Sequence, residues 1–254
     1  MNCSTVKIAI VTSSEFSYAS ELLSEKLPVD IEPVLIVNQP QPRPLTKVLK
    51  KILRVGILGV LIGYFARKWY RIEFKSVLLI AKKKNIPTYS VHDFRLNSDL
   101  AQVIENCSIG ISMGNGYIPE RFFKLFKNGM INIHHEILPD YAGAQSVVWP
   151  IIRNELETGF SIHFLSRNID KGDIVVVKKR PILFKSSLKE TVHNNYAESL
   201  RLSILEILQL LAMPIENWGR IPNRVKENYT TPTFLEWLAA FLNHSHKNKK
   251  LTRD

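Results

Sequence analysis

The stretch VKIAIVTSSEFSYASELLSEKLPVDIEPVLIV (residues 6–37) decides the fold, because two apolar runs bracket an amphipathic one. Val6–Thr12 and Ile31–Val37 are short apolar runs typical of buried strands. Between them, Glu15–Leu27 has apolar residues near helical spacing, which predicts a helix. A β-α-β unit of this kind favours a parallel sheet with right-handed crossovers. We therefore expect an α/β fold in which a mostly parallel, twisted sheet is flanked by helices.

The alternation of strands and helices continues along the chain. The sequence predicts strands at 88–91, 109–112, 130–134, 160–165 and 173–178, and helices at 76–84, 98–106, 118–127, 147–154, 188–213 and 234–242. Pro119 in the first turn of 118–127 and Gly129 just beyond it are typical helix limits. The apolar run Ile8–Val11 is too short for the core of a signal peptide, so we expect a first strand there.

The bulk composition is that of a folded globular protein. Of the 254 residues, 45% are hydrophobic and 22% are charged, which excludes a mainly disordered chain. The two cysteines, Cys3 and Cys107, have no metal-type spacing and are too few for a disulfide framework. This favours a reducing compartment, and we expect a cytoplasmic protein.

The positive charge is concentrated in one segment. Between Gln41 and Ser90 there are twelve Lys or Arg residues and one acid, Glu73, so this segment accounts for the whole net charge of +11. A localised basic block indicates an anionic partner, such as phosphate groups, nucleic acid or a lipid surface.

The segment NIHHEILPDYAG (residues 132–143) concentrates proton-transfer chemistry at the carboxyl end of a predicted strand, where open α/β sheets bind ligands. Asn132 and His134 lie two apart and share a face, whereas His135 points to the other side. An amide beside an imidazole can stabilise an oxyanion and move a proton. Asp170 is the candidate carboxylate, and we expect it to favour the protonated form of His134.

A series of motifs resembles the catalytic domain of the folate-dependent formyltransferases. The series is Asn-x-His, Leu-Pro-x-Tyr-x-Gly, Trp-x-Ile, Thr-Gly-Phe-Ser-Ile-His and Ile-Asp-x-Gly-Asp-Ile, within residues 132–175. Weaker similarity covers most of residues 6–182. The family includes methionyl-tRNA, glycinamide ribonucleotide and nucleotide-sugar N-formyltransferases. The resemblance implies a Rossmann-like formyltransferase fold.

The resemblance also implies a site and a reaction. An acceptor amine would attack the formyl carbon of N10-formyltetrahydrofolate, with no metal required. The implied catalytic residues are Asn132, His134 and Asp170. The implied folate-binding residues are Met113, Gly114, Asn115, Gly116, Tyr117, Ile118 and Asp170. We expect Tyr141, Gln145 and Ser146 to contact the acceptor.

Several of these residues have an alternative interpretation. His135 and Glu136 are predicted to be local structural residues, and Asp170 could simply form a turn with Lys171 and Gly172. A metal site built from His134, His135 and His163 is disfavoured, because adjacent residues of a strand face opposite sides.

Two departures from the family pattern bear on the acceptor. Ala142 stands where relatives commonly have Arg, so one polar contact is lost or supplied elsewhere. The loop after the first strand, Thr12–Glu15, has no glycine for close approach of a phosphate and carries an acid. This disfavours a phosphoribosyl acceptor and therefore purine synthesis.

The predicted organisation is a catalytic domain at 1–185 with a basic hydrophobic insertion at 43–75, followed by a helical C-terminal extension at 186–254. Relatives that act on methionyl-tRNA carry a C-terminal β-barrel instead. The apolar core of the insertion, residues 55–66, spans about 18 Å as a helix, short of the ~30 Å needed to cross a membrane. The insertion could pack on the domain or at a homodimer interface, lie on an anionic membrane surface, or hold substrate phosphates.

The leading hypothesis is a formyltransferase acting on a nucleotide-linked amino sugar for cell-surface glycans, located in the cytoplasm or peripherally at the inner face of the membrane. The alternative acceptor is methionyl-tRNA or another aminoacyl carrier. A third hypothesis is an inactive basic module that binds a membrane surface or nucleic acid, of which nucleic acid is the less expected partner. Steep salt-dependent binding without folate-dependent turnover would select it.

Overall fold

The structure, a computed structural model, describes residues 5–41 and 45–251. Cys3, Arg43 and the outermost ends of the predicted domains lie outside these ranges. The strands are β1 Val6–Thr12, β2 Ile31–Gln39, β3 Thr88–His92, β4 Ile109–Ser112, β5 Met130–His134, β6 Ala142–Gly143, β7 Glu157–Phe164, β8 Ile174–Pro181 and β9 Asn228–Tyr229. The α-helices are α1 Ala19–Ser24, α2 Leu45–Ala66, α3 Val77–Lys83, α4 Ser98–Glu105, α5 Glu120–Phe123, α6 Trp149–Ile152, α7 Leu188–Leu211 and α8 Phe234–Leu251, with 3-10 turns η1 Arg67–Tyr70, η2 Ser146–Val148 and η3 Ile215–Asn217.

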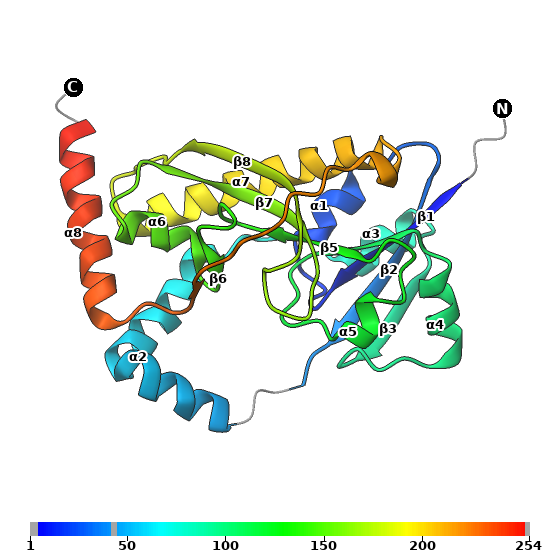
Figure 1. Ribbon diagram of the computed structural model, residues 1–254, viewed down its shortest axis with the longest axis horizontal. Coiled ribbons are helices and arrows are strands. Elements are labelled where there is room, and N and C mark those ends of the chain that lie inside the picture. Colours follow the sequence, from blue (N-terminus) through cyan, green and yellow to red (C-terminus); the bar gives the residue numbers. More distant parts are fainter. Residues whose placement is uncertain (1–4, 42–44, 252–254) are drawn as a thin grey trace.

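In the described part of the chain the main sheet has seven strands in the order β3-β2-β1-β4-β5-β7-β8 (Figure 1). The first five run parallel, and β7 and β8 run antiparallel at one edge. This confirms the expected mostly parallel α/β sheet. The strand β5 therefore lies at the junction between the parallel and antiparallel parts, with β4 on one side and β7 on the other.

Alternating residues of the central strands build two apolar layers. On β1, Ile8 and Ile10 face a core shared with α1, α3 and α7, whereas Ala9 and Val11 face a core shared with α4 and α5. The long helix α7 belongs to the first core, because Leu200 and other residues of α7 pack directly against the sheet. Both faces of the parallel part are thus covered (Figure 1).

Polar residues before the first turn fix the starts of several helices. The side chains of Ser76, Asn97 and Ser187 each accept a hydrogen bond from a backbone N–H in the first turn of α3, α4 and α7. Helix α8 begins with a capping box, in which Thr233 and Glu236 exchange side chain to backbone hydrogen bonds.

Several predicted helices differ in length from those observed, and three differ most. Helix α1 begins at Ala19 rather than Glu15, because Phe16 bridges Ser76 and so the chain stays extended up to that point. The helix predicted at 118–127 is reduced to α5, since the chain after Phe123 continues as turns into Gly129 (φ +76°). Helix α8 continues well past Leu242, where Asn243 donates to two carbonyls of α6.

The predicted insertion forms α2 and η1. Gly56 (φ 72°, ψ 162°) breaks α2 into two helical arms. The second arm packs on the segment leading into α8, since a Cβ at Gly59 would lie 3.0 Å from the Pro232 carbonyl oxygen. Exposed apolar residues remain on α2, including Leu53 and Ile57. Among the described residues, no helix is both long and apolar enough to span a membrane.

Candidate active site

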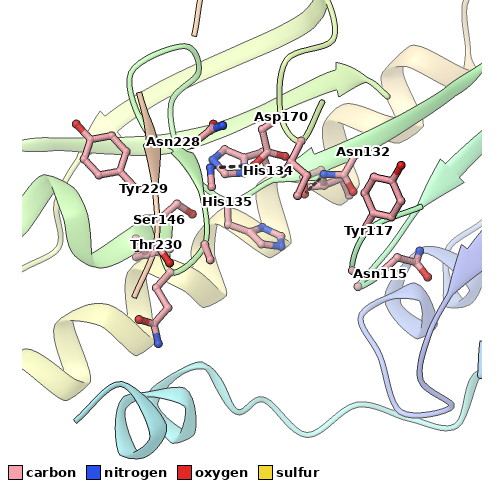
Figure 2. A pocket seen from close by; sticks show the side chains of 18 of the residues that line it. Asn115, Tyr117, Asn132, His134, His135, Ser146, Asp170, Asn228, Tyr229 and Thr230 are labelled. Carbon is pink, nitrogen blue, oxygen red and sulfur yellow. Dashed lines mark hydrogen bonds and ion pairs between the residues drawn. The ribbon is translucent and has the colours of Figure 1, made fainter. Parts of the chain in front are cut away.

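A pocket of about 770 Å³ opens at the carboxyl end of β5. Asn132 and His134 reach it from β5, the loop 114–118 reaches it from the end of β4, and Asp170 reaches it from the loop between β7 and β8. Figure 2 shows the three side chains together, with His134 and Asp170 facing each other. The structure thus brings together the residues that the sequence analysis selected at 132, 134 and 170.

Asp170 is held by several contacts at the base of this pocket. Its Oδ2 lies 3.6 Å from His134 Nδ1 and accepts a 2.9 Å hydrogen bond from the backbone N–H of Gly143. Its Oδ1 lies 3.5 Å from His163 Nε2. The backbone of Asp170 is left-handed (φ 53°), and Asn223 donates to its carbonyl oxygen. The Asp170 turn is therefore a real structural feature, and it aims the carboxylate at two imidazoles.

The pKa of His134 is lowered on balance, although Asp170 favours its protonated form as expected. Burial lowers the pKa of His134, and this effect exceeds the opposite influence of the Asp170 carboxylate. Burial alone would raise the pKa of Asp170, but its hydrogen bond with His163 and the proximity of His134 bring that pKa below its ordinary value. The pair at rest is a neutral imidazole beside a carboxylate.

The contacts of His134 define its tautomer. The Nε2 atom lies 2.6 Å from the backbone carbonyl oxygen of Tyr141, which can only accept, so Nε2 carries the proton. The Nδ1 atom of the neutral ring is then unprotonated and faces Asp170. A proton taken up by this ring arrives on Nδ1, next to the carboxylate.

His163 is a member of this group that the sequence analysis considered only as a metal ligand. The register of the antiparallel β5 and β7 places it directly opposite Asn132. The amide nitrogen of Asn132 lies 3.4 Å from His163 Nε2. The histidine in the motif Thr-Gly-Phe-Ser-Ile-His was visible in the sequence, but its partner could not be deduced without the register.

The predicted folate and acceptor residues divide into two groups. Gly114 to Ile118, Gln145 and Ser146 line the pocket. Met113 and Tyr141 do not. Met113 is fully buried in the sheet core, and Tyr141 packs beside Tyr229 behind the pocket, so it reaches the site only through its carbonyl oxygen.

His135 also lines the pocket, contrary to the prediction that it faces away. Strand β5 ends at His134, so the alternation of faces no longer applies one residue later. The His135 ring packs edge-on against Tyr18 and Tyr196, with centroid distances of 5.5 and 4.9 Å. Burial lowers the pKa of His135 to about 3, so this ring is neutral.

Glu136 has the structural role that was predicted. It is fully buried, and its carboxyl oxygens accept hydrogen bonds from Thr158 Oγ1 and from the N–H groups of Ile137 and Gly159. Burial nevertheless raises the pKa of Glu136 to about 8. Ala142 is fully buried in an apolar cluster with Leu138 and Ile174.

Several pocket residues were not identified from the sequence. They come from α2 and η1 (Arg54, Arg67 and Tyr70), from α7 (Tyr196) and from β9 and the residue after it (Asn228, Tyr229 and Thr230). Figure 2 shows Asn115 and Tyr117 on one side of His134 and the β9 residues on the other. No group of three or more His, Cys, Asp or Glu suited to a metal ion occurs within residues 5–41 and 45–251.

The chain matches the formyl transferase family model over residues 75–204, slightly more than half of its length. It is 39% identical over 83 residues to a GDP-perosamine N-formyltransferase of Brucella melitensis, which covers 33% of this chain and 32% of that protein. It is 24% identical over 164 residues to a methionyl-tRNA formyltransferase of Caldanaerobacter subterraneus, which covers 63% of this chain and 52% of that protein. The chain therefore spans about a third to a half of the length of these relatives.

Among solved structures, the fold is similar to that of an N-formyltransferase from Helicobacter canadensis in complex with folinic acid and dTDP-3-aminofucose. The TM-score is 0.53 at 19% identity, over 91% of this chain and 71% of the other.

Proposed function

Because this chain belongs to the formyl transferase family, we propose that it moves a formyl group from N10-formyltetrahydrofolate to the amine of an acceptor. The observation that carries this proposal is the meeting of Asn132, His134 and Asp170 at one pocket, with His134 Nδ1 3.6 Å from Asp170 Oδ2. Asn132 and His134 share β5, whereas Asp170 comes from the distant loop between β7 and β8, and each has chemistry that formyl transfer requires.

The residues that line the pocket fit a reduced folate. A volume of about 770 Å³ lies within the range of ligand pockets. Gly114 (φ +78°) and Gly116 allow close approach to the backbone of the loop after β4. Leu165 and Ile169 supply apolar surface on the loop before Asp170.

In the proposed reaction, the proton that leaves the acceptor amine passes through His134 and ends on the folate. The acceptor amine forms a bond to the formyl carbon, and the amide of Asn132 donates a hydrogen bond to the developing oxyanion. His134, neutral at rest, takes the amine proton onto Nδ1, and Asp170 stabilises the resulting imidazolium. The bond from the formyl carbon to N10 of the folate then breaks, and N10 receives the proton.

We further propose that the acceptor amine is carried by an activated amino sugar. The names of the Brucella relative and of the bound Helicobacter structure support this class. The loop after β1 supports it as well, because its hydroxyls are already engaged. Ser13 Oγ donates to Asn115, and Thr12 Oγ1 donates to Ser17, so this loop offers no open cradle to a phosphoribosyl group.

A methionyl-tRNA acceptor is the second candidate, supported by the relative that matches 63% of this chain. The two candidates separate in one experiment. The protein is incubated with N10-formyltetrahydrofolate and either a panel of nucleotide-linked amino sugars or charged initiator tRNA, and products are weighed by mass spectrometry. A mass gain of one formyl group on a sugar supports the first candidate, and formylation of the tRNA alone selects the second. No transfer to any amine would refute the proposed function.

A further inference from the structure

The insertion contributes two arginines to the candidate active site. Arg54 at the end of the first arm of α2 and Arg67 in η1 both line the pocket that contains His134 and Asp170. Both side chains are exposed. Neither has an ion-pair or hydrogen-bond partner among the described residues, and Asp170 is the sole acid lining the described pocket. Two guanidinium groups thus line this pocket, and neither is paired with a carboxylate in the described part of the chain.

Hydrogen bonds and a ring contact fix the second arm of α2 and η1 to the rest of the site. Gln145, which itself lines the pocket, donates from Nε2 to the carbonyl oxygen of Gly63 at 3.2 Å. His193 Nδ1 donates to the carbonyl oxygen of Trp69 at 2.9 Å, and the Trp69 ring packs edge-on against Trp237. Figure 2 shows the insertion (cyan) running beside the pocket.

Three residues that line this pocket carry buried polar atoms without a partner among the described residues. Tyr70 Oη, Gln145 Oε1 and His135 Nδ1 are buried and have no hydrogen-bond partner in the part of the chain that the structure describes. All three residues line the pocket, and Tyr70 follows Arg67 within η1. Leaving such an atom buried and unpaired costs roughly 1–3 kcal/mol, so a cluster of them favours a site completed by a polar ligand.

The chemistry of the two arginines selects phosphate groups. A guanidinium binds phosphate oxygens with two parallel hydrogen bonds, and this geometry suits a diphosphate spanned by two such groups. We propose that Arg54 and Arg67 bind the diphosphate of the acceptor, so that the insertion, rather than the loop after β1, determines the acceptor class. This inference rests on the proposed formyl transfer for its biological meaning. The diphosphate could belong to a nucleotide or to a polyprenyl lipid.

The binding test needs no turnover. The full chain is titrated calorimetrically with inorganic pyrophosphate in the absence of folate. Arg54→Gln and Arg67→Gln are each expected to weaken binding about tenfold, as loss of a bidentate charged contact does. Lys50→Gln and Arg71→Gln are matched controls, because both residues are exposed in the same insertion and do not line the pocket. The controls are expected to change binding by less than about twofold, since isolated surface charges contribute little.

Two results would overturn the inference: no saturable binding of pyrophosphate to the wild type, or equal weakening in the controls and the pocket variants. Parallel titrations with uridine diphosphate and with farnesyl diphosphate distinguish the two sources, since the tighter ligand identifies the carrier. Turnover is measured separately. Formyl transfer that persists unchanged in Arg54→Gln and Arg67→Gln refutes the diphosphate site and leaves the proposed function standing. If the wild type binds pyrophosphate as expected but transfers no formyl group, the proposed function is refuted and the diphosphate site stands.

Discussion

At the scale of single residues, the pocket depends on how burial and hydrogen bonding set three protonation states. His134 is neutral because burial outweighs the nearby carboxylate, and Asp170 stays charged because His163, His134 and the Gly143 N–H stabilise its anion. Buried Glu136 holds its proton instead. The protonation states of the three groups differ because their burial and their hydrogen-bond and charge partners differ.

Replacing Asp170 with Asn tests the proposed role of its charge. The carboxylate raises the pKa of His134, so its loss should lower that pKa further, and turnover should fall on the order of a hundredfold or more. NMR titration of the His134 ring and steady-state kinetics measure the two effects. A near-normal kcat in the folded variant would refute the assigned role.

Replacing Asn132 with Ala removes one proposed donor to the oxyanion. The kcat should fall on the order of a hundredfold, with little change in folate affinity, because the contact forms mainly in the transition state. Asn106→Ala is a matched control at an exposed helix end. An equal effect of the two substitutions on kcat would contradict the assignment.

The buried Glu136 makes stability depend on pH in a defined direction. Its folded pKa is raised from 4.5 to about 8, so the folded state holds an extra proton between these values. This contribution to stability is complete below pH 4.5 and declines as pH rises towards 8. Between pH 6 and 8 the loss should be about 2–3 kcal/mol in the wild type and absent in Glu136→Gln. Urea unfolding of both proteins at the two pH values measures this loss of stability. An equal change in the wild type and in Glu136→Gln would exclude the assigned role of Glu136.

At the scale of elements, the break in α2 determines where the insertion places Arg54 relative to Arg67. Gly56 sits at φ 72° and ψ 162°, a conformation open essentially to glycine alone. A Cβ at this position would meet no atom within 4 Å, so crowding plays no part in the choice of residue. The glycine is required for its backbone conformation.

Gly56→Ala should therefore change the angle between the two arms of α2. We expect a loss of about 1–3 kcal/mol of stability if the kink persists, or a straightened helix that moves Arg54 away from the pocket. Pyrophosphate binding should weaken in the second case although both arginines remain. Calorimetry and thermal unfolding separate the two outcomes. Unchanged stability together with unchanged binding would show that the kink is unimportant.

At the scale of the whole molecule, α8 packs against both the insertion and the rest of the domain and so holds them together. Trp237 is buried between Trp69 of η1 and the apolar cluster around α6 and α7. His244, further along α8, hydrogen-bonds Thr191 of α7 at 2.8 Å. The last helix thus joins the insertion to the sheet through α7 (Figure 1).

Trp237→Ala should cost about 3–5 kcal/mol, as expected for truncation of a buried aromatic residue. Because Trp69 loses its support, the KM for the acceptor should rise more than the KM for the folate. Leu235→Ala, at a position 72% exposed on the same helix, should change stability by less than about 0.5 kcal/mol. Denaturant unfolding measures the loss of stability, and separate KM measurements compare the two substrates. Equal increases in both KM values would contradict the proposed role of α8 in positioning the insertion.

The strands of the main sheet were well predicted from the sequence, and Val6–Thr12, Ile109–Ser112 and Met130–His134 were found with the expected limits, whereas the two-residue strands β6 and β9 were not predicted. Short apolar runs bounded by turn residues encode a strand locally, so no distant contact is needed. Helix lengths were predicted less well, because tertiary contacts altered them: the bridge at Phe16 delays the start of α1, and the contacts of Asn243 with α6 lie in the part of α8 beyond its predicted end.

The sequence by itself determined the α/β fold, the formyltransferase motifs and the selection of residues 132, 134 and 170, since each depends on neighbours in the chain. Only the tertiary structure placed His163 opposite Asn132, left His134 neutral and brought Arg54 and Arg67 to the same pocket. Strand register, desolvation and the docking of an insertion all arise from contacts between segments far apart in sequence. A local sequence pattern therefore cannot predict them.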